Sequence, residues 1–100
     1  MGIYELKKSK SINVFGKTCP VKITSLDDNF LGLFYYDEFR IEISDKCPKE
    51  KFDEIFIHEA VHAVFNRSSL NQCAISHDAQ EIICDQVAKF ITENFKLTKK

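Results

Sequence analysis

Long hydrophobic runs are missing from the sequence. No stretch approaches the roughly 20 apolar residues of a membrane-spanning helix, and the chain does not open with a basic segment followed by an apolar stretch and a cleavage site. We therefore expect a cytoplasmic protein with no membrane partner. Internal repeats, low-complexity tracts and interdomain linkers are missing too, so we expect a single domain over residues 1–100.

Cysteine is sparse and widely spaced. Cys19, Cys47, Cys73 and Cys84 lie 28, 26 and 11 residues apart, and no CxxC pair occurs. This spacing excludes a zinc ribbon and a dense disulfide framework. In a reducing cytoplasm such residues stay as thiols, so we expect all four to be reduced. Cys73 or Cys84 could lie near a metal, although free cysteine is usually a small buried hydrophobic residue.

An excess of positive charge is missing as well. The sequence has 14 lysine and arginine residues against 15 acidic residues, which gives a formal net charge of −1. Proteins that hold a nucleic-acid backbone normally carry a basic patch or stripe. There is therefore no strong nucleic-acid signal, and the lysines within residues 1–22 are expected to be solvated.

The sequence does contain a metal-binding motif, His58-Glu59-Ala60-Val61-His62. Two imidazoles four positions apart on a helix lie one turn apart on one face, where both can reach one Zn²⁺. Glu59 is turned about 100° from His58, so it stands beside the metal and can take a proton from an attacking water as a general base. An HExxH motif is only moderately specific, and the alternative is a pair of helix histidines without a metal.

The flanks of the motif favour the metal. Residues 52–65 are apolar nearly all round a helix, which predicts a position in the protein interior. Histidines on a buried helix need polar partners or a metal. Four residues on the side away from the histidines can back this helix onto a sheet: Phe56, Ala60, Ala63 and Val64.

A third metal ligand is expected downstream, because catalytic zinc usually has three protein ligands and one open position. Phe65 and Ser68 stand where the metzincin pattern requires glycine and histidine, which excludes that pattern. The best candidate is Glu81, nineteen residues after His62.

Other residues near Glu81 could be the third metal ligand or could orient a metal ligand. His77 and Asp78 compete for the third ligand position. Asp85, one helical turn after Glu81, is predicted to accept the outer N–H of a zinc-bound histidine and so fix its tautomer. The alternative is that these acids form an ordinary acidic helix start favoured by the helix dipole.

Hydrophobic patterns predict an α+β protein with a small, antiparallel-rich sheet. Strands are expected at about residues 12–15, 21–24, 31–36 and 39–43. Gly16-Lys17 is predicted to form a turn, and Asp37-Glu38 a tight hairpin. In the last strand, the alternation of Phe39, Ile41 and Ile43 with charged residues predicts one buried face.

Two helices are expected to pack on this sheet. The first covers about residues 48–67 and carries the motif, and the second covers about 78–95 and is capped by Ser76 or His77. The small side chain of Ala88 should let the two helices approach. The stripe of the second helix predicted to face the core is Ile83, Val87, Phe90, Ile91 and Asn94.

The order of these features resembles a known family. The motif followed by Glu81-Ile-Ile-Cys-Asp85 resembles the gluzincin arrangement of thermolysin-type peptidases. Residues 12–95 more closely resemble the small ImmA/IrrE-like metallopeptidases of phages and mobile elements, with a Gly-Lys turn, a Leu-Gly strand and an Ile-x-Ile strand before the motif helix. The resemblance implies a minimal zincin-like fold and a Zn²⁺-dependent endopeptidase. Its substrate would be a protein or peptide, such as a phage or mobile-element repressor.

Several points stay open at this level. A second electrophile normally stabilises the oxyanion in such a reaction, and His77, Tyr35 and Tyr36 are all candidates. An extended substrate is expected to pair with an exposed strand edge supplied by residues 31–43. One alternative is a metal-binding interaction module, an inhibitor or anchor without proteolysis. The other is a SprT-like protease of DNA-associated proteins, against which the near-neutral charge argues. The cleavage site and the oligomeric state are not predicted.

Overall fold

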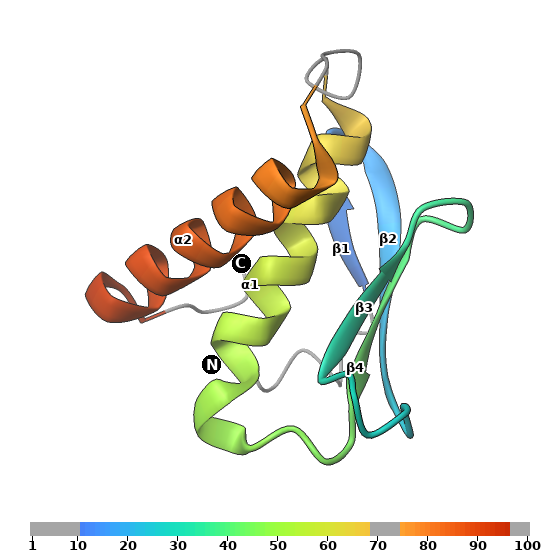
Figure 1. The fold of residues 1–100 in the computed structure, drawn as a ribbon. Helices are drawn as coiled ribbons and strands as arrows, with labels where there is room; N and C mark the ends of the chain where they lie inside the picture. The colour runs from blue at the N-terminus through green and yellow to red at the C-terminus, as the bar shows by residue number, and fades with distance from the viewer. Residues whose placement is uncertain (1–10, 69–74, 97–100) are drawn as a thin grey trace.

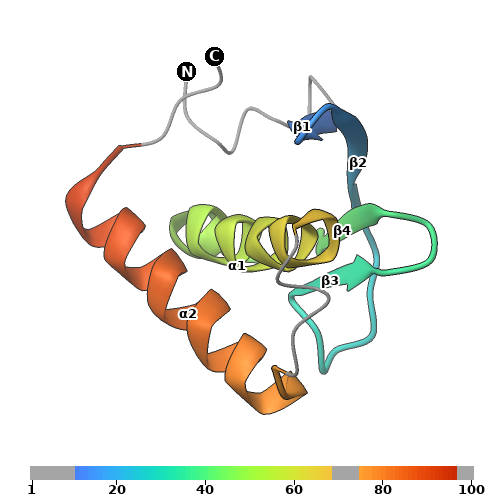
Figure 2. The same ribbon diagram turned by 90° about the horizontal axis from the view of Figure 1, so that it is seen from above.

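The computed structural model of the chain describes residues 11–68 and 75–96. The strands are β1 (Ser11–Val14), β2 (Lys17–Thr24), β3 (Gly32–Tyr35) and β4 (Arg40–Ser44), and the helices are α1 (Lys49–Arg67) and α2 (His77–Asn94). The sheet packs on one side of α1 and α2 packs on another, so α1 lies between them (Figures 1 and 2). The architecture is α+β, as predicted.

The sheet is mixed, with the strand order β1-β2-β4-β3. The β1–β2 and β3–β4 pairs are antiparallel, whereas β2 and β4 are parallel. Two of the three pairings are therefore antiparallel, which agrees with the predicted antiparallel-rich sheet. Because β3 stands last in this order, one of its edges is not paired with another described strand.

The first hairpin corrects the predicted turn by one residue. Phe15 and Gly16 both have positive φ, 49° and 82°, and Val14 pairs with Lys17 across them. This is the two-residue loop whose twist matches that of the flanking strands. Lys17 therefore opens β2, which begins four residues before the predicted position 21, and Phe15 leaves the strand and is 62% exposed.

The second hairpin turns at residues 36–39, so β4 begins after Phe39 and not at it. Phe39 has a positive φ of 51° and is nevertheless only 2% exposed. Ile41 and Ile43 are fully buried, which confirms the predicted alternation. The aromatic ring of Phe39 joins the core from a turn, and the core contacts hold its backbone in the left-handed region.

Helix α1 supplies much of the core. Phe52, Phe56 and Ala63 are buried in the same cluster as the inward side chains of the sheet, and Ala60 packs against that cluster. The prediction for Val64 was wrong, because its side chain is 38% exposed. Val64 lies about 100° round the helix from Ala63, which turns it away from the sheet.

Helix α2 corrects the predicted stripe. Its buried residues are Cys84 and Ala88, both fully buried, and Ile91 packs against the core, whereas Ile83 and Phe90 are 39% and 62% exposed. Small side chains at Cys84 and Ala88 allow a close approach to α1, so packing fixes the rotation of the helix. Ser76 is the N-cap, and its Oγ accepts a hydrogen bond from the Ala79 amide at 3.1 Å.

Two further expectations concern the chain as a whole. Cys19, Cys47 and Cys84 are free thiols, and Cys73 lies outside the described residues. Within residues 11–68 and 75–96, neither helix combines the length and the apolar composition that a membrane span requires.

The buried face of β4 should dominate stability. Ile41→Ala removes a fully buried side chain from a central strand, so we expect the free energy of unfolding to fall by about 2–5 kcal/mol. The matched control is Lys22→Ala on neighbouring β2, which is exposed and should change stability by no more than about 0.5 kcal/mol. Urea unfolding measures both, and equal effects would contradict this account of the core.

Candidate metal centre

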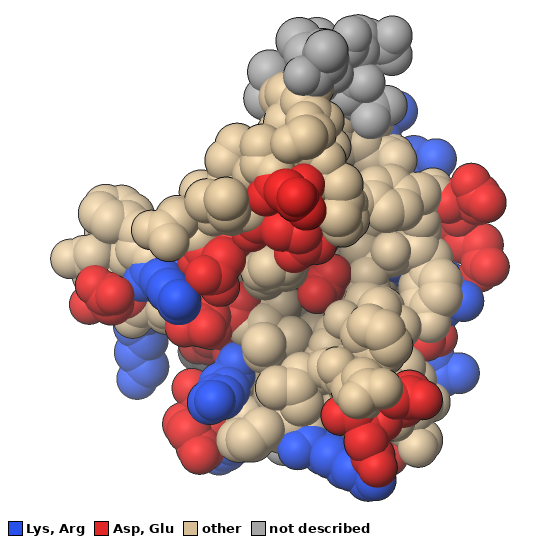
Figure 3. Space-filling model, viewed as in Figure 1, with Lys and Arg blue, Asp and Glu red and all other residues tan. Residues whose placement is uncertain are grey.

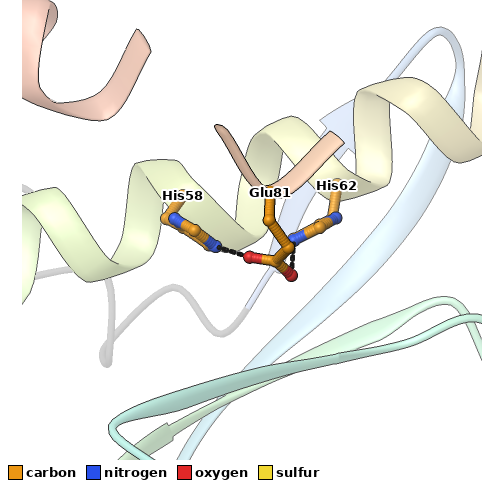
Figure 4. Close-up of side chains that lie close together, drawn as sticks. All are labelled: His58, His62 and Glu81. Carbon is orange, nitrogen blue, oxygen red and sulfur yellow. Dashed lines mark hydrogen bonds and ion pairs between the residues drawn. The ribbon is translucent and has the colours of Figure 1, made fainter. Parts of the chain in front are cut away.

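Three side chains from the two helices meet at one point (Figure 4). Nε2 of His58 lies 3.0 Å from Oε2 of Glu81, and Nε2 of His62 lies 3.0 Å from Oε1 of the same carboxylate. The potential ligand atoms of the three residues all lie within 4.8 Å of one another. The residues predicted as metal ligands are therefore brought together, and they could hold a metal ion.

The donor set suits a small divalent cation. Ligands of one zinc ion at about 2.0–2.1 Å from the metal lie roughly 3–4 Å apart, so a small adjustment of these side chains is enough. Two imidazole nitrogens and one carboxylate form a ligand set used by catalytic zinc. Nε2 of His62 faces the centre, because it lies 3.0 Å from Oε1 of Glu81. Nδ1 of His62 is buried and has no hydrogen-bond partner among the described residues.

Glu59 lies next to the ligand group without belonging to it. Its side chain is buried at 9% exposure, and burial, followed by the nearby charge of Glu81, raises its pKa to about 7. A carboxyl group with this pKa takes up and releases a proton near neutral pH. This is the property expected of a general base at this position.

Gly32 at the start of β3 sets the distance between the sheet and the motif helix. A Cβ atom at this position would lie 2.8 Å from Cγ2 of Ile55, 3.1 Å from Cγ of Glu59 and 3.3 Å from its Oε2. The space that a side chain at position 32 would need is therefore taken by Ile55 and Glu59. Sequence reasoning did not single out Gly32 as a site residue, because only the packing of α1 on β3 gives it this role.

The ligand group opens into a cleft of about 620 Å³ between α1, α2 and β3. The β3 side of the cleft is formed by residues 29–34 and Tyr36, none of which is charged. The acids of the lining, Glu59, Glu81 and Asp85, come from the two helices. Figure 3 shows this division, with acidic surface along the hollow on the side of α2 and uncharged surface on the side of β3.

Only two of the three residues predicted as candidates to stabilise the oxyanion lie in the cleft. Tyr36 and His77 line the cleft. Tyr35 does not line the cleft. Its hydroxyl donates to Oε1 of Glu42 at 2.8 Å, and Arg40 stacks on its ring at 3.7 Å. The prediction that Tyr35 is a candidate is therefore corrected.

Tyr36 is placed close to the metal ligands. Its ring centroid lies 6.4 Å from that of His62. Burial, and then the charges of Glu81, Cys84 and Glu59, raise the pKa of its phenol above the ordinary value of 10.0. Tyr36 therefore keeps its proton at neutral pH and can donate a hydrogen bond into the cleft.

The remaining predicted residues lie on α2. Asp85 lines the cleft and pairs with Lys89 at 3.0 Å, so its role toward a zinc-bound histidine stays a prediction. Asp78 is exposed and is not part of the group that could hold a metal. Cys84 is fully buried one turn after Glu81, and burial raises its pKa to about 12, which keeps the thiol protonated.

No protein-family model, no curated protein and no solved structure matches the chain. The function of the site is therefore inferred from the chemistry of its own residues. Those residues combine two histidines, a carboxylate that reaches both of them, and a second, buried carboxylate in an open cleft.

Gly32→Ala should strain the contact between β3 and α1. The added methyl group overlaps Ile55, so we expect a loss of about 1–3 kcal/mol in the free energy of unfolding, measured in urea. Ile55→Ala removes the obstructing atom and should recover part of this loss in the double variant. Gly16→Ala is the control: it meets no atom within 4 Å but has a φ of +82°, so Ile55→Ala should not rescue it.

Glu59 should make the stability of the metal-free protein depend on pH. Its pKa is about 7 in the folded chain against an ordinary value of 4.5, so between these values only the folded state holds the proton. Protonated Glu59 therefore stabilises the folded state fully below pH 4.5. This stabilisation is lost as the pH rises to 7, which lowers the free energy of unfolding by on the order of 3 kcal/mol.

Glu59→Gln is neutral at every pH and should remove this contribution. Urea unfolding in EDTA at pH 5 and pH 8 should show a larger loss of stability in the wild type than in the variant. An equal loss of unfolding free energy in the wild type and in Glu59→Gln would contradict a burial of Glu59 that raises its pKa.

Proposed function

We propose that the chain is a zinc-dependent endopeptidase with a minimal zincin-like fold, which hydrolyses a peptide bond in a protein substrate. The observation that carries the proposal is the meeting of His58, His62 and Glu81 in an open cleft, with Glu59 buried beside them. A purely structural zinc site is normally closed by a fourth protein ligand, whereas a catalytic site keeps one position open. Three ligands among residues 11–68 and 75–96, with an adjoining cleft, fit the catalytic arrangement.

His58, His62 and Glu81 would hold the metal. Zinc, when bound, lowers the pKa of a coordinated water to about 7 and polarises the carbonyl of the scissile bond. Glu59 accepts the proton of the attacking water at a carboxylate oxygen and passes it to the leaving amine. In the metal-free chain, burial raises the pKa of Glu59 to about 7. An acid–base catalyst works best when its pKa lies near the operating pH.

Tyr36 is the better placed of the two remaining electrophile candidates. Its ring lies near that of His62, and its phenol is protonated at neutral pH, so it can donate to the carbonyl oxygen on which negative charge develops. His77 is more exposed, with 71% of its side-chain surface accessible. We therefore assign stabilisation of the oxyanion to Tyr36.

The edge of β3 that pairs with no other described strand is the proposed docking site for an extended substrate. The amide of Ser44 donates to the carbonyl of Leu31 at 2.8 Å. Backbone groups of alternate residues in an antiparallel pair point to opposite sides, so those of Gly32 and Phe34 point away from β4. Both residues line the cleft, and a peptide paired there would lie beside Glu59.

The resemblance to ImmA/IrrE-like metallopeptidases suggests where to look for a substrate. Phage and mobile-element repressors can be co-expressed with the protein, and fluorescein-labelled casein serves as a general probe. Elemental analysis of untagged wild type should give about one zinc per chain, the ratio expected for one mononuclear site. A protein that binds zinc yet leaves every polypeptide intact would support the interaction module in place of the peptidase.

Two glutamate variants separate catalysis from metal binding. Glu59→Gln should keep the zinc and lower turnover by roughly 10²–10⁴, because it removes the base and no ligand. Glu81→Gln should lose zinc, since a neutral amide is a poor ligand. Full activity of Glu59→Gln would refute the assigned mechanism, and loss of zinc from Glu59→Gln would refute the division into base and ligand.

A further inference from the structure

We infer that His77 is a positioning residue for the metal ligand Glu81, holding the carboxylate oxygen that the metal leaves free. The inference rests on the zinc site of the proposed function and concerns a role of His77 separate from catalysis. Its basis is the set of partners of Glu81, which changes when the histidine nitrogens turn to a metal.

Glu81 has three side-chain partners among the described residues. Nε2 of His58 and Nε2 of His62 each lie 3.0 Å from a different oxygen of the carboxylate, and Nε2 of His77 lies 3.8 Å from Oε1. The first two contacts are hydrogen bonds in which an imidazole N–H donates to the carboxylate. The third is an ion-pair contact slightly too long for a hydrogen bond.

Metal binding removes the first two donors. An imidazole nitrogen that gives its lone pair to a metal carries no hydrogen, so neither His58 nor His62 can donate from Nε2 while it is a ligand. Glu81 would then bind the metal through one oxygen and need a donor for the other. Ligating carboxylates in proteins are generally held by such outer hydrogen bonds.

His77 is the remaining partner, and its position allows this hydrogen bond. It stands four residues before Glu81 on α2, the spacing that places two side chains next to each other on a helix. Both residues line the same cleft. The side chain of His77 is 71% exposed, so it can turn to shorten the 3.8 Å separation without disturbing the core.

The assignment predicts an effect on metal affinity. Loss of an outer partner of a ligand typically weakens metal binding by about 10–100-fold. We therefore expect His77→Ala to raise the Kd for Zn²⁺ at least tenfold, measured by competition with a chromophoric chelator. His77→Gln retains an N–H donor and should recover part of the affinity.

Matched controls separate positioning from a structural effect. Asp78→Ala changes the adjacent exposed residue, which is not part of the cleft lining, and should leave the Kd unchanged. The melting temperature of metal-free His77→Ala should equal that of the wild type, because the side chain is exposed. In a Glu81→Gln background, His77→Ala should have no further effect on affinity, since its role acts through Glu81.

Three outcomes would overturn the inference. One is an unchanged Kd for Zn²⁺ in His77→Ala. Another is a loss of affinity on His77→Ala that is as large in the Glu81→Gln background as in the wild type. The third is a loss as complete as that of His62→Ala, which would make His77 a direct ligand. Zinc binding that depends on His77 in a protein that cleaves nothing would refute the peptidase and leave the inference standing. Proteolysis with unchanged affinity in His77→Ala would refute the inference alone.

Discussion

The close approach of α1 and α2 at Cys84 and Ala88 is the constraint on which the site depends. Both side chains are small and fully buried, so the two helix backbones can come near each other. This contact turns Glu81 toward α1, where its carboxylate reaches both histidines at 3.0 Å. The same rotation leaves Ile83 and Phe90 in solvent, so the chain forms its polar centre at the expense of apolar burial.

A second constraint acts on the opposite side of α1. Gly32 has no side chain, so the edge strand can approach α1 until a Cβ atom at this position would lie only 3.3 Å from Oε2 of Glu59. Burial between strand and helix disfavours the charged form and raises the pKa of Glu59 to about 7. The packing of β3 against α1 therefore positions Glu59 and causes the larger part of its pKa shift, and the nearby charge of Glu81 adds to that shift.

Sequence patterns predicted the elements well and their faces less well. All four strands and both helices occur near the expected residues, because turn residues, caps and hydrophobic period are local signals. The first turn was predicted one residue too late, at Gly16-Lys17 and not at Phe15-Gly16, because a glycine indicates a turn without fixing which position of the turn it occupies. The buried face of α2 was predicted wrongly, because the stripe with Ile83 and Phe90 has larger apolar side chains than the face with Cys84 and Ala88 that is buried.

The sequence by itself determined the chemistry that the site can offer. Helical geometry places His58 and His62, four residues apart, on one face of a helix. The sequence also supplies a carboxylate nineteen residues later, in the next predicted helix. Only the tertiary structure decided that Glu81 reaches both imidazoles and that Tyr36 and His77 share the cleft while Tyr35 lies outside it. It also decided that Glu59 and Ile55 leave no room for a side chain at Gly32. Those relations join residues far apart in the chain, and they depend on how small side chains let helix meet helix and helix meet strand.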